Sequence, residues 1–372
     1  MYADHLIQPW LHCLLDHLPG AEVFDAHTHV GEHDPSGFTA RWDELLGSLE
    51  AIDARAAVFP LSEPSGYREA NLRCAEAAAQ SGGRLTPFVR LTPSEVGLLE
   101  DGLSAGARGV KLHLSSDGFD LDDIRLNRLY ETAHERHLPV IVHAGPELDS
   151  IAYEVLELCA RWPGLRLVLA HCALTDLGQL RGHVEQAPNL FFDTAWWNPA
   201  NVLALFRLIP PGRILNASDL PYSTPVSHTF TTARCAWQAG LDVAQITAVI
   251  GGQFARLVEG AEPLELGPPP AAEPQPPSPL LEVISTNLLA ALEPMQRGDE
   301  PGVPLTVARH ACRVPDDDPD APTIAAVSRL LDLYEEHREH IPQRNQHLPG
   351  WDLISAAAIV ARTPAAPLPA PT

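Results

Sequence analysis

The chain has 372 residues, 45% hydrophobic and 20% charged, and these values suit a soluble globular protein with one large domain and an appendage, or with two domains. Its formal net charge of -23 argues against nucleic acid and membrane as partners, because phosphate groups are bound by Lys and Arg, and leaves a small-molecule substrate as the expected partner. The six cysteines show no paired spacing, and no basic N-terminal segment leads into a long apolar run, so we expect a cytoplasmic protein.

Strand-like and helical segments alternate along the chain as far as residue 259. A first helix is predicted over 3–18, where apolar residues recur at helical spacing up to Pro19-Gly20. Strand-like runs then follow at 22–29, 56–60, 85–91, 109–114, 139–144, 165–172, 190–194 and 213–219. Helical segments are predicted at 42–54, 67–80, 94–105, 122–137, 149–161, 174–187, 199–208, 226–239 and 242–259. The alternation predicts an α/β fold, a (β/α)8 TIM barrel, in preference to an open sheet, because no glycine-rich fingerprint follows the first strand.

The rest of the chain is predicted to be a helical extension of this barrel. Residues 1–262 form the barrel unit with its N-terminal helix, and residues 263–279 form a proline-rich linker that should be extended and semi-rigid. The C-terminal extension over 280–372 is expected to hold helices at 280–297, 320–339 and 350–362 and to be disordered from Thr363. It carries no recognisable chemistry, and its helices offer a contact surface for a homodimer.

The first strand ends in the sequence Asp25-Ala-His-Thr-His29. Side chains on a strand alternate between its two faces, so Asp25, His27 and His29 point the same way. Two imidazoles on one face at the end of a strand supply two ligands for a divalent metal. Because the chain holds 17 histidines, one His-x-His pair can also arise by chance. The metal interpretation therefore depends on the other strand ends.

Further ionisable residues close the later strands, and in a (β/α)8 barrel these ends converge on one pocket. They are Arg90, Lys111, His113, His143, His171 and Asp219. Imidazole nitrogen and carboxylate oxygen suit a divalent ion, which His27, His29, His143 and Asp219 would hold. A catalytic ion lowers the pKa of bound water towards about 7. Asp219 can take a proton from this water as a general base, and His171 can polarise a carbonyl or carry a proton.

Six motifs give the chain a resemblance to a known family. They are Asp-Ala-His-Thr-His at 25–29, Gly-Val-Lys-Leu-His at 109–113, Val-Ile-Val-His-Ala-Gly at 140–145, Leu-Ala-His-Cys at 169–172, Ala-Ser-Asp-Leu-Pro at 217–221 and Gly-Gly-Gln-Phe-Ala-Arg-Leu at 251–257. Over 22–259 the chain resembles the amidohydrolase superfamily, and within it the group of aminocarboxymuconate-semialdehyde decarboxylase and related hydrolases. The resemblance implies that His27, His29, His143 and Asp219 bind one divalent metal and that His171 acts on the substrate. Zinc is the metal expected first, and Mn, Fe or Co also suit nitrogen and oxygen ligands.

Lys111 leaves the number of ions open. In the two-metal branch of the superfamily, which includes dihydroorotase and phosphotriesterase, a lysine on the fourth strand is carboxylated and bridges two ions. Here Lys111, His143 and His171 would supply the second site, and His171 would then be a ligand instead of a proton carrier. Alternatively, Lys111 stays an ammonium group that pairs with a carboxylate or stabilises a developing oxyanion, and we expect a single ion.

Four residues are candidates for substrate binding. Arg90 can clamp a substrate carboxylate with two hydrogen bonds, or can pair with an internal acid. Trp196 follows the seventh strand and Tyr222 follows Asp219, so both can wall the pocket, although packing within the loops explains them equally well. His113, two residues after Lys111, is the fourth candidate.

These residues predict a metal-dependent hydrolase that cleaves an amide, cyclic amide, lactone or ester bond of a small molecule through an activated water. The alternative is a metal-dependent nonoxidative decarboxylase of a small carboxylic acid, with Arg90 or Lys111 as the cation beside the departing carboxylate. In a third interpretation the barrel is a non-catalytic binding or scaffold protein, but the intact ligand set argues against this.

Overall fold

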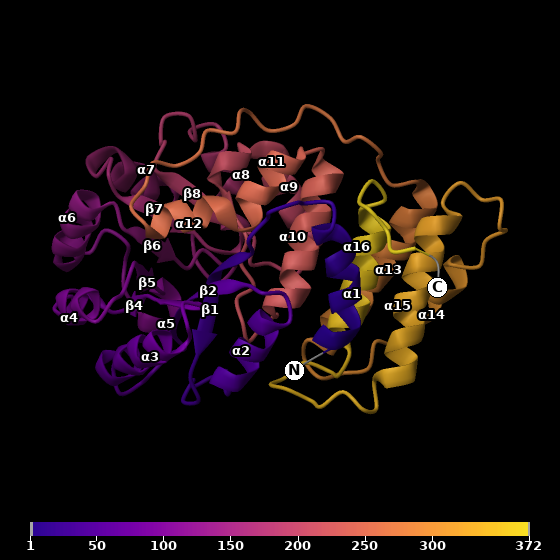
Figure 1. Ribbon diagram of the computed structural model, residues 1–372, viewed down its shortest axis with the longest axis horizontal. Coiled ribbons are helices and arrows are strands. Elements are labelled where there is room, and N and C mark those ends of the chain that lie inside the picture. The colour runs from indigo at the N-terminus through magenta and orange to yellow at the C-terminus, as the bar shows by residue number, and fades with distance from the viewer. Residues whose placement is uncertain (1–2, 371–372) are drawn as a thin grey trace.

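The computed structural model describes residues 3–370, and its short parallel strands lie in the left half of Figure 1, surrounded by helices. They are β1 (Phe24–Val30), β2 (Arg55–Pro60), β3 (Leu85–Pro87), β4 (Val89–Arg90), β5 (Val110–Leu112), β6 (Pro139–Val142), β7 (Arg166–Leu169), β8 (Leu190–Asp193) and β9 (Ile214–Leu215). Neighbours in the chain are neighbours in the sheet, first from β1 to β3 and then from β4 to β9. Every predicted strand is present, in most cases shortened at its ends.

Backbone hydrogen bonds join these two sets of strands into a barrel. Phe88 separates β3 from β4, but its N–H donates to the carbonyl of Val58 on β2 at 2.9 Å, so residues 85–90 act as one barrel strand. At the other junction, the N–H of Ala26 on β1 donates to the carbonyl of Asn216, just after β9, at 2.8 Å. The predicted α/β TIM barrel is confirmed.

Helices follow the strands and cover the barrel. They are α2 (Trp42–Glu50), α3 (Arg68–Gln80), α4 (Leu98–Ser104), α6 (Asn127–Arg136), α7 (Ala152–Arg161), α8 (Leu177–Leu180), α9 (Pro199–Leu208) and α10 (Pro225–Ala239), preceded by α1 (Asp4–Leu15). Shorter helices are α5 (Leu114–Asp117), α11 (Val243–Thr247), η5 (Ala248–Gly252) and α12 (Gln253–Val258). The helix predicted over 174–187 is reduced to the single turn α8, because Gly178 and Gly182 weaken the helical preference of that segment.

Aromatic side chains fill the interior of the barrel below the strand ends. They include Phe24, Phe59, Phe88, Phe191 and Phe254, each at most 1% exposed. Phe254 lies on α12, and the preceding helix η5 packs under the start of β1. The approach is so close that a Cβ on Gly251 would lie 2.0 Å from the carbonyl oxygen of Glu22. The N-terminal end of the barrel is therefore plugged, and a site can form only at the carboxyl ends of the strands.

The C-terminal extension packs directly against the barrel. It contains α13 (Pro279–Met295), α14 (Gly302–Ala311), α15 (Ala321–His337) and α16 (Trp351–Arg362), of which α14 was not predicted. The buried helix α16 contacts α13 and α15 on one side and α10 and α1 on the other. Residues 261–278 lead there without helix or strand and run along α9 and α10, where the carbonyl of Ala271 accepts a hydrogen bond from Arg207 (Figure 1). The apolar core is therefore continuous from the barrel into the extension.

The prediction of disorder from Thr363 is wrong for residues 363–370, whereas 371–372 lie outside the described residues. Arg234 on α10 is fully buried, and its guanidinium donates to the hydroxyl and the carbonyl of Thr363 at 2.8 Å each and to the carbonyl of Pro367 at 3.0 Å. A buried guanidinium requires acceptors, and this segment supplies them. Its Pro- and Ala-rich composition does not reveal that role.

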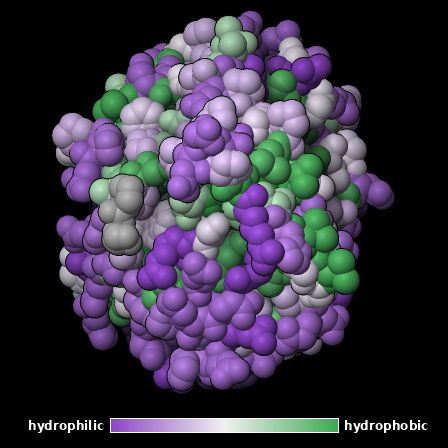
Figure 2. All heavy atoms as spheres, turned by 90° about the vertical axis from the view of Figure 1, so that its right-hand side faces the viewer, coloured by the Kyte–Doolittle hydropathy of each residue, from purple (hydrophilic) through white to green (hydrophobic). Residues whose placement is uncertain are grey.

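Apolar and polar side chains are interspersed on the face that the extension presents (Figure 2). Val283 on α13 and Val303 and Val307 on α14 are 47%, 74% and 39% exposed. The homodimer stays a prediction. Within residues 3–370, no helix combines the length and the apolarity that crossing a membrane requires.

Two carboxyl groups are buried where α16 meets α1. Asp352 accepts a hydrogen bond from the N–H of Ala3 at 2.5 Å, and Asp4 accepts from the hydroxyls of Thr224 and Ser48 at 2.6 and 2.7 Å. Burial raises the pKa of Asp4 to about 6 and that of Asp352 to about 7. A carboxyl group whose pKa is higher in the folded than in the unfolded state favours folding most at low pH. The stabilisation is therefore lost as the pH rises from about 4 towards 7.

We expect Asp352→Asn to raise the free energy of unfolding at pH 8 by about 2 kcal/mol, because a neutral amide avoids the cost of burying a charge. The gain should shrink at pH 5, where the wild-type carboxyl group is protonated. Thermal unfolding at the two pH values, followed by circular dichroism, measures the difference. Asp299→Asn, on an exposed loop, is the matched control, and an equal gain at both pH values would contradict the assignment.

Candidate active site

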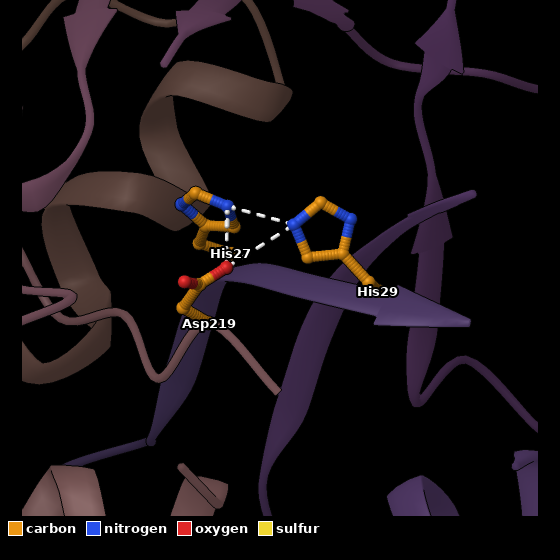
Figure 3. Close-up of side chains that lie close together, drawn as sticks. All are labelled: His27, His29 and Asp219. Carbon is orange, nitrogen blue, oxygen red and sulfur yellow. Dashed lines mark hydrogen bonds and ion pairs between the residues drawn. The ribbon is translucent and has the colours of Figure 1, made fainter. Parts of the chain in front are cut away.

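Two histidines of β1 and an aspartate that follows β9 meet at one point (Figure 3). His27 Nε2 and His29 Nε2 lie 3.2 Å apart, and Asp219 Oδ1 lies 3.0 Å from the first and 3.1 Å from the second. The histidines share a face because they stand two residues apart on a strand. Asp219 reaches them because the last strand of the barrel lies beside the first.

The other ring nitrogen of each histidine has its own acceptor. His27 Nδ1 lies 2.8 Å from Asp193 Oδ2, and His29 Nδ1 lies 3.2 Å from the carbonyl oxygen of Pro60. Carboxylate and carbonyl oxygens only accept, so each Nδ1 carries the proton and each Nε2 presents a lone pair. Two lone pairs and a carboxylate oxygen therefore face one another.

This donor set fits a divalent cation. Ligands at about 2.1 Å in a tetrahedral site lie about 3.4 Å apart, close to the separations observed here. Burial lowers the pKa of His29 to about 3, which keeps its ring in the neutral form that binds metal. Burial and Lys111 also act to lower the pKa of His27, yet Asp219 and Asp193 outweigh them and raise it. Without a metal ion, the raised pKa of His27 favours a proton at the position where a divalent cation would balance the negative charge of Asp219 and Asp193.

His143, the fourth predicted ligand, lies apart from these three donors. Its Nδ1 is 3.0 Å from His171 Nε2, and its Nε2 contacts the carboxylate of Glu147. The ring stacks on His113, with 3.9 Å between centroids and 11° between planes. Within residues 3–370, His113, His143 and Glu147 form a second group of potential ligands, whose atoms lie within 4.8 Å of one another. Ligation of the first site by His143 stays a prediction.

Asp193 is a site residue that sequence reasoning missed. Its Oδ2 holds the ring of His27, and its Oδ1 accepts from the backbone N–H of His171 at 2.8 Å and of Ala195 at 3.0 Å. It is fully buried, and although burial opposes ionisation, His27 lowers its pKa. The sequence feature that could have identified Asp193 is its position as the last residue of β8, because ionisable residues at the other strand ends were identified by the same criterion.

His171 and Asp219 face each other with strained backbone. Both have a φ of 57°, in the left-handed region that residues with a Cβ avoid. Asp219 Oδ2 lies 3.9 Å from His171 Nδ1, which itself is 2.8 Å from the carbonyl oxygen of Ala195. Such strain costs about 1–3 kcal/mol and is held by the surrounding structure, often at functional positions. Burial raises the pKa of Asp219, but interactions with His27 and His29 hold it well below its usual range, so the carboxylate is ionised.

Lys111 is fully buried under the same cluster. Its Nζ lies 3.0 Å from His27 Nε2 and 5.2 Å from the centroid of the Phe59 ring. Burial lowers its pKa to about 8. Of the three residues predicted for a second ion, His143 and His171 contact each other, whereas Lys111 contacts His27. The second ion stays a prediction.

Arg90 pairs with an internal acid, the second of its two predicted roles. Its Nε and Nη2 donate to the carboxylate of Asp117 at 3.2 and 3.1 Å, and Nη2 also donates to the hydroxyl of Ser116 at 2.7 Å. The side chain is 1% exposed. While this pair holds, Arg90 has little capacity left to clamp a substrate carboxylate.

A cavity of about 620 Å³ opens over these residues. The predicted residues that line it are His29, Arg90, His113, His143, His171, Trp196, Asp219 and Tyr222. Lining residues that the sequence did not single out include Asp34, Phe38, Glu147, His228, Gln296, His347 and Trp351. The last three belong to the extension, so a part of the chain without recognisable chemistry contributes to the pocket wall.

A family model described as amidohydrolase matches residues 24–252, which include every strand of the barrel. The chain belongs to the amidohydrolase family. The predicted resemblance to this superfamily is confirmed, and the finer placement in its aminocarboxymuconate-semialdehyde decarboxylase-like group stays a prediction. As predicted, the amidohydrolase is a metal-dependent enzyme. Comparison with curated proteins found no match.

Solved structures share the barrel of the amidohydrolase at low sequence identity. An uncharacterized TIM-barrel protein from Bordetella bronchiseptica is 15% identical with a TM-score of 0.53, over 64% of this chain and 99% of its own. A 2,6-dihydroxybenzoate decarboxylase in complex with 2,6-dihydroxybenzoate is 15% identical with a TM-score of 0.50, over 64% and 98%. A 4-oxalomesaconate hydratase from Rhodopseudomonas palustris is 16% identical with a TM-score of 0.48, over 64% and 96%. The first two likenesses show the fold, and more than a third of this chain has no counterpart in either structure.

Proposed function

We propose that this amidohydrolase hydrolyses an amide, cyclic amide, lactone or ester bond of a small molecule. The proposal rests on the position of Asp219, whose two carboxylate oxygens face different groups. Its Oδ1 lies 3.0 and 3.1 Å from the Nε2 atoms of His27 and His29, while its Oδ2 faces His171 at 3.9 Å. One carboxylate can thus hold the metal and take a proton from water.

The other residues have roles that follow from their positions. A divalent metal held by His27, His29 and Asp219, with zinc as the first expectation, would supply Lewis acidity and lower the pKa of water. His171 lines the pocket beside Asp219 and is placed to carry a proton to the leaving group. Lys111 Nζ, 3.0 Å from His27, adds positive charge close to where a carbonyl oxygen becomes negative.

Nonoxidative decarboxylation is the second candidate. It is supported by the likeness in fold to the decarboxylase that acts on 2,6-dihydroxybenzoate, which has a TM-score of 0.50. The pairing of Arg90 with Asp117 weighs against it, because it leaves only Lys111 as a cation for the departing carboxylate.

A product analysis of the metal-loaded enzyme in ¹⁸O-labelled water separates the two reactions. Amides, lactones and aryl esters are tested beside aromatic carboxylic acids of similar size. Hydrolysis predicts an acid product with one ¹⁸O atom, and we expect His171→Asn to lower kcat by about 100-fold while bound metal is unchanged. Carbon dioxide release from the acids, with the amides and esters left intact, would contradict hydrolysis.

A further inference from the structure

The extension reaches the pocket through the segment that precedes α16. The side chain of Asn345 accepts a hydrogen bond from the N–H of Thr39, in the loop after β1, at 2.8 Å. The N–H of Leu348 donates to the carbonyl of Met295, at the end of α13, at 2.8 Å. The segment is thereby held between the barrel and the extension, and the side chains it presents to the pocket have a defined place.

Four rings form a continuous row along the pocket, and all four line it. Tyr222 contacts Phe38 with 4.5 Å between centroids, Phe38 lies 6.5 Å from His347, and His347 stacks on Trp351 at 5.2 Å and 21°. The N–H of Tyr222 donates to the carbonyl of Asp219 at 2.9 Å. The row therefore starts beside the metal donors and ends on the extension.

The aromatic row, Phe38, Tyr222, His347 and Trp351, carries no charge at neutral pH. Burial lowers the pKa of His347 to about 4. Other groups around the pocket disfavour an anion there. Asp34 and Glu147 also line the pocket, and Arg90, the single Lys or Arg among its described lining residues, is paired with Asp117.

We propose that the aromatic row binds an uncharged aromatic or heteroaromatic ring of the substrate, so that the extension helps to set specificity. Planar rings stack on such surfaces with about 0.5–1.5 kcal/mol beyond the burial of their area. A cavity of about 620 Å³ has room for a ring as well as the reacting group. This assignment rests on the proposed function, which places the reacting carbonyl at His27, His29 and Asp219. His347 and Trp351 lie beyond residue 252, where the family match ends.

Hydroxamic acids are suitable probes, because they bind divalent metals through the hydroxamate and can carry a chosen tail. Isothermal titration of the metal-loaded enzyme compares acetohydroxamate, 3-phenylpropionohydroxamate, 3-cyclohexylpropionohydroxamate and 3-(4-carboxyphenyl)propionohydroxamate. We expect the phenyl compound to bind about tenfold more tightly than the cyclohexyl compound, which has the same reach without a planar ring. The carboxyphenyl compound should lose this advantage.

Substitutions test whether the tighter binding of the phenyl compound comes from the aromatic row. We expect Trp351→Leu and Phe38→Ala each to remove the preference for the phenyl over the cyclohexyl compound and to leave acetohydroxamate affinity within about twofold. Phe38 is a loop residue, so its variant tests the row if Trp351→Leu fails to fold. Trp237→Leu, on α10 and outside the pocket, is the control and should keep the preference. Acetohydroxamate binding without a phenyl preference, or a preference retained in both row variants, would overturn this proposal alone. Failure of every hydroxamate to bind would overturn the proposed function together with it.

Discussion

Replacing both His27 and His29 by Ala is expected to leave the purified protein without its divalent metal. The two rings supply two of the three donors that meet within 3.2 Å, and Asp219 alone offers a single carboxylate. One carboxylate in competition with water binds a divalent ion far more weakly than a chelating set. We therefore expect bound metal to fall from one ion per chain to less than about a tenth, and any hydrolysis to fall with it.

Metal analysis by mass spectrometry after growth in metal-supplemented medium measures this loss. His12→Ala with His17→Ala is the matched control, because these histidines are exposed at the end of α1 and outside the pocket. Circular dichroism shows whether the double variant keeps its fold, which we expect because Asp193 and Lys111 can pair in the vacated space. A folded His27→Ala/His29→Ala protein with undiminished metal would show that the ion is held elsewhere.

Asp193→Asn is expected to weaken metal binding by about 10–100-fold without removing any ligand. The carboxylate fixes the His27 ring through Nδ1 at 2.8 Å and so keeps Nε2 free of a proton. An amide keeps the shape but loses the charge, and it can present an N–H where His27 requires an acceptor. The ring then loses the partner that sets its tautomer, and its basicity towards metal falls.

Competition with a fluorescent chelator gives the metal dissociation constant of the Asp193→Asn protein. Asp176→Asn is the control, since Asp176 is equally buried and bonds to Ser150 and the backbone of Ile151, away from the histidines. An unchanged dissociation constant for Asp193→Asn would mean that its carboxylate only supports the backbone of His171 and Ala195.

The sequence was sufficient for the barrel because each strand and helix carries its own local signal. Apolar runs and helical spacing are local patterns, and the strand ends of a parallel barrel must converge, so the sequence alone was enough to place His27, His29 and Asp219 together. The sequence also offered Trp196, Tyr222 and His113 as candidates for the pocket, which they line. These three lie in or next to loops that directly follow strands.

What the sequence did not reveal depends on contacts between distant parts of the chain. From the sequence, Arg90 could bind a substrate carboxylate or pair with an internal acid. Only the fold shows that its guanidinium pairs with Asp117. His347 and Trp351 reach the pocket because α16 packs against α10 and α1, a contact that no local pattern encodes. The tail after Thr363 is ordered by Arg234, which lies 129 residues earlier in the chain.

In the proposed site, His27, His29 and Asp219 together hold a catalytic divalent ion. Diffraction from crystals of the metal-loaded protein, collected on both sides of the absorption edge of the bound metal, locates the ion directly. We expect an anomalous peak within about 2.3 Å of His27 Nε2, His29 Nε2 and an oxygen of Asp219. A peak bounded instead by His113, His143 and Glu147, with none between the β1 histidines, would contradict this assignment of the metal ligands.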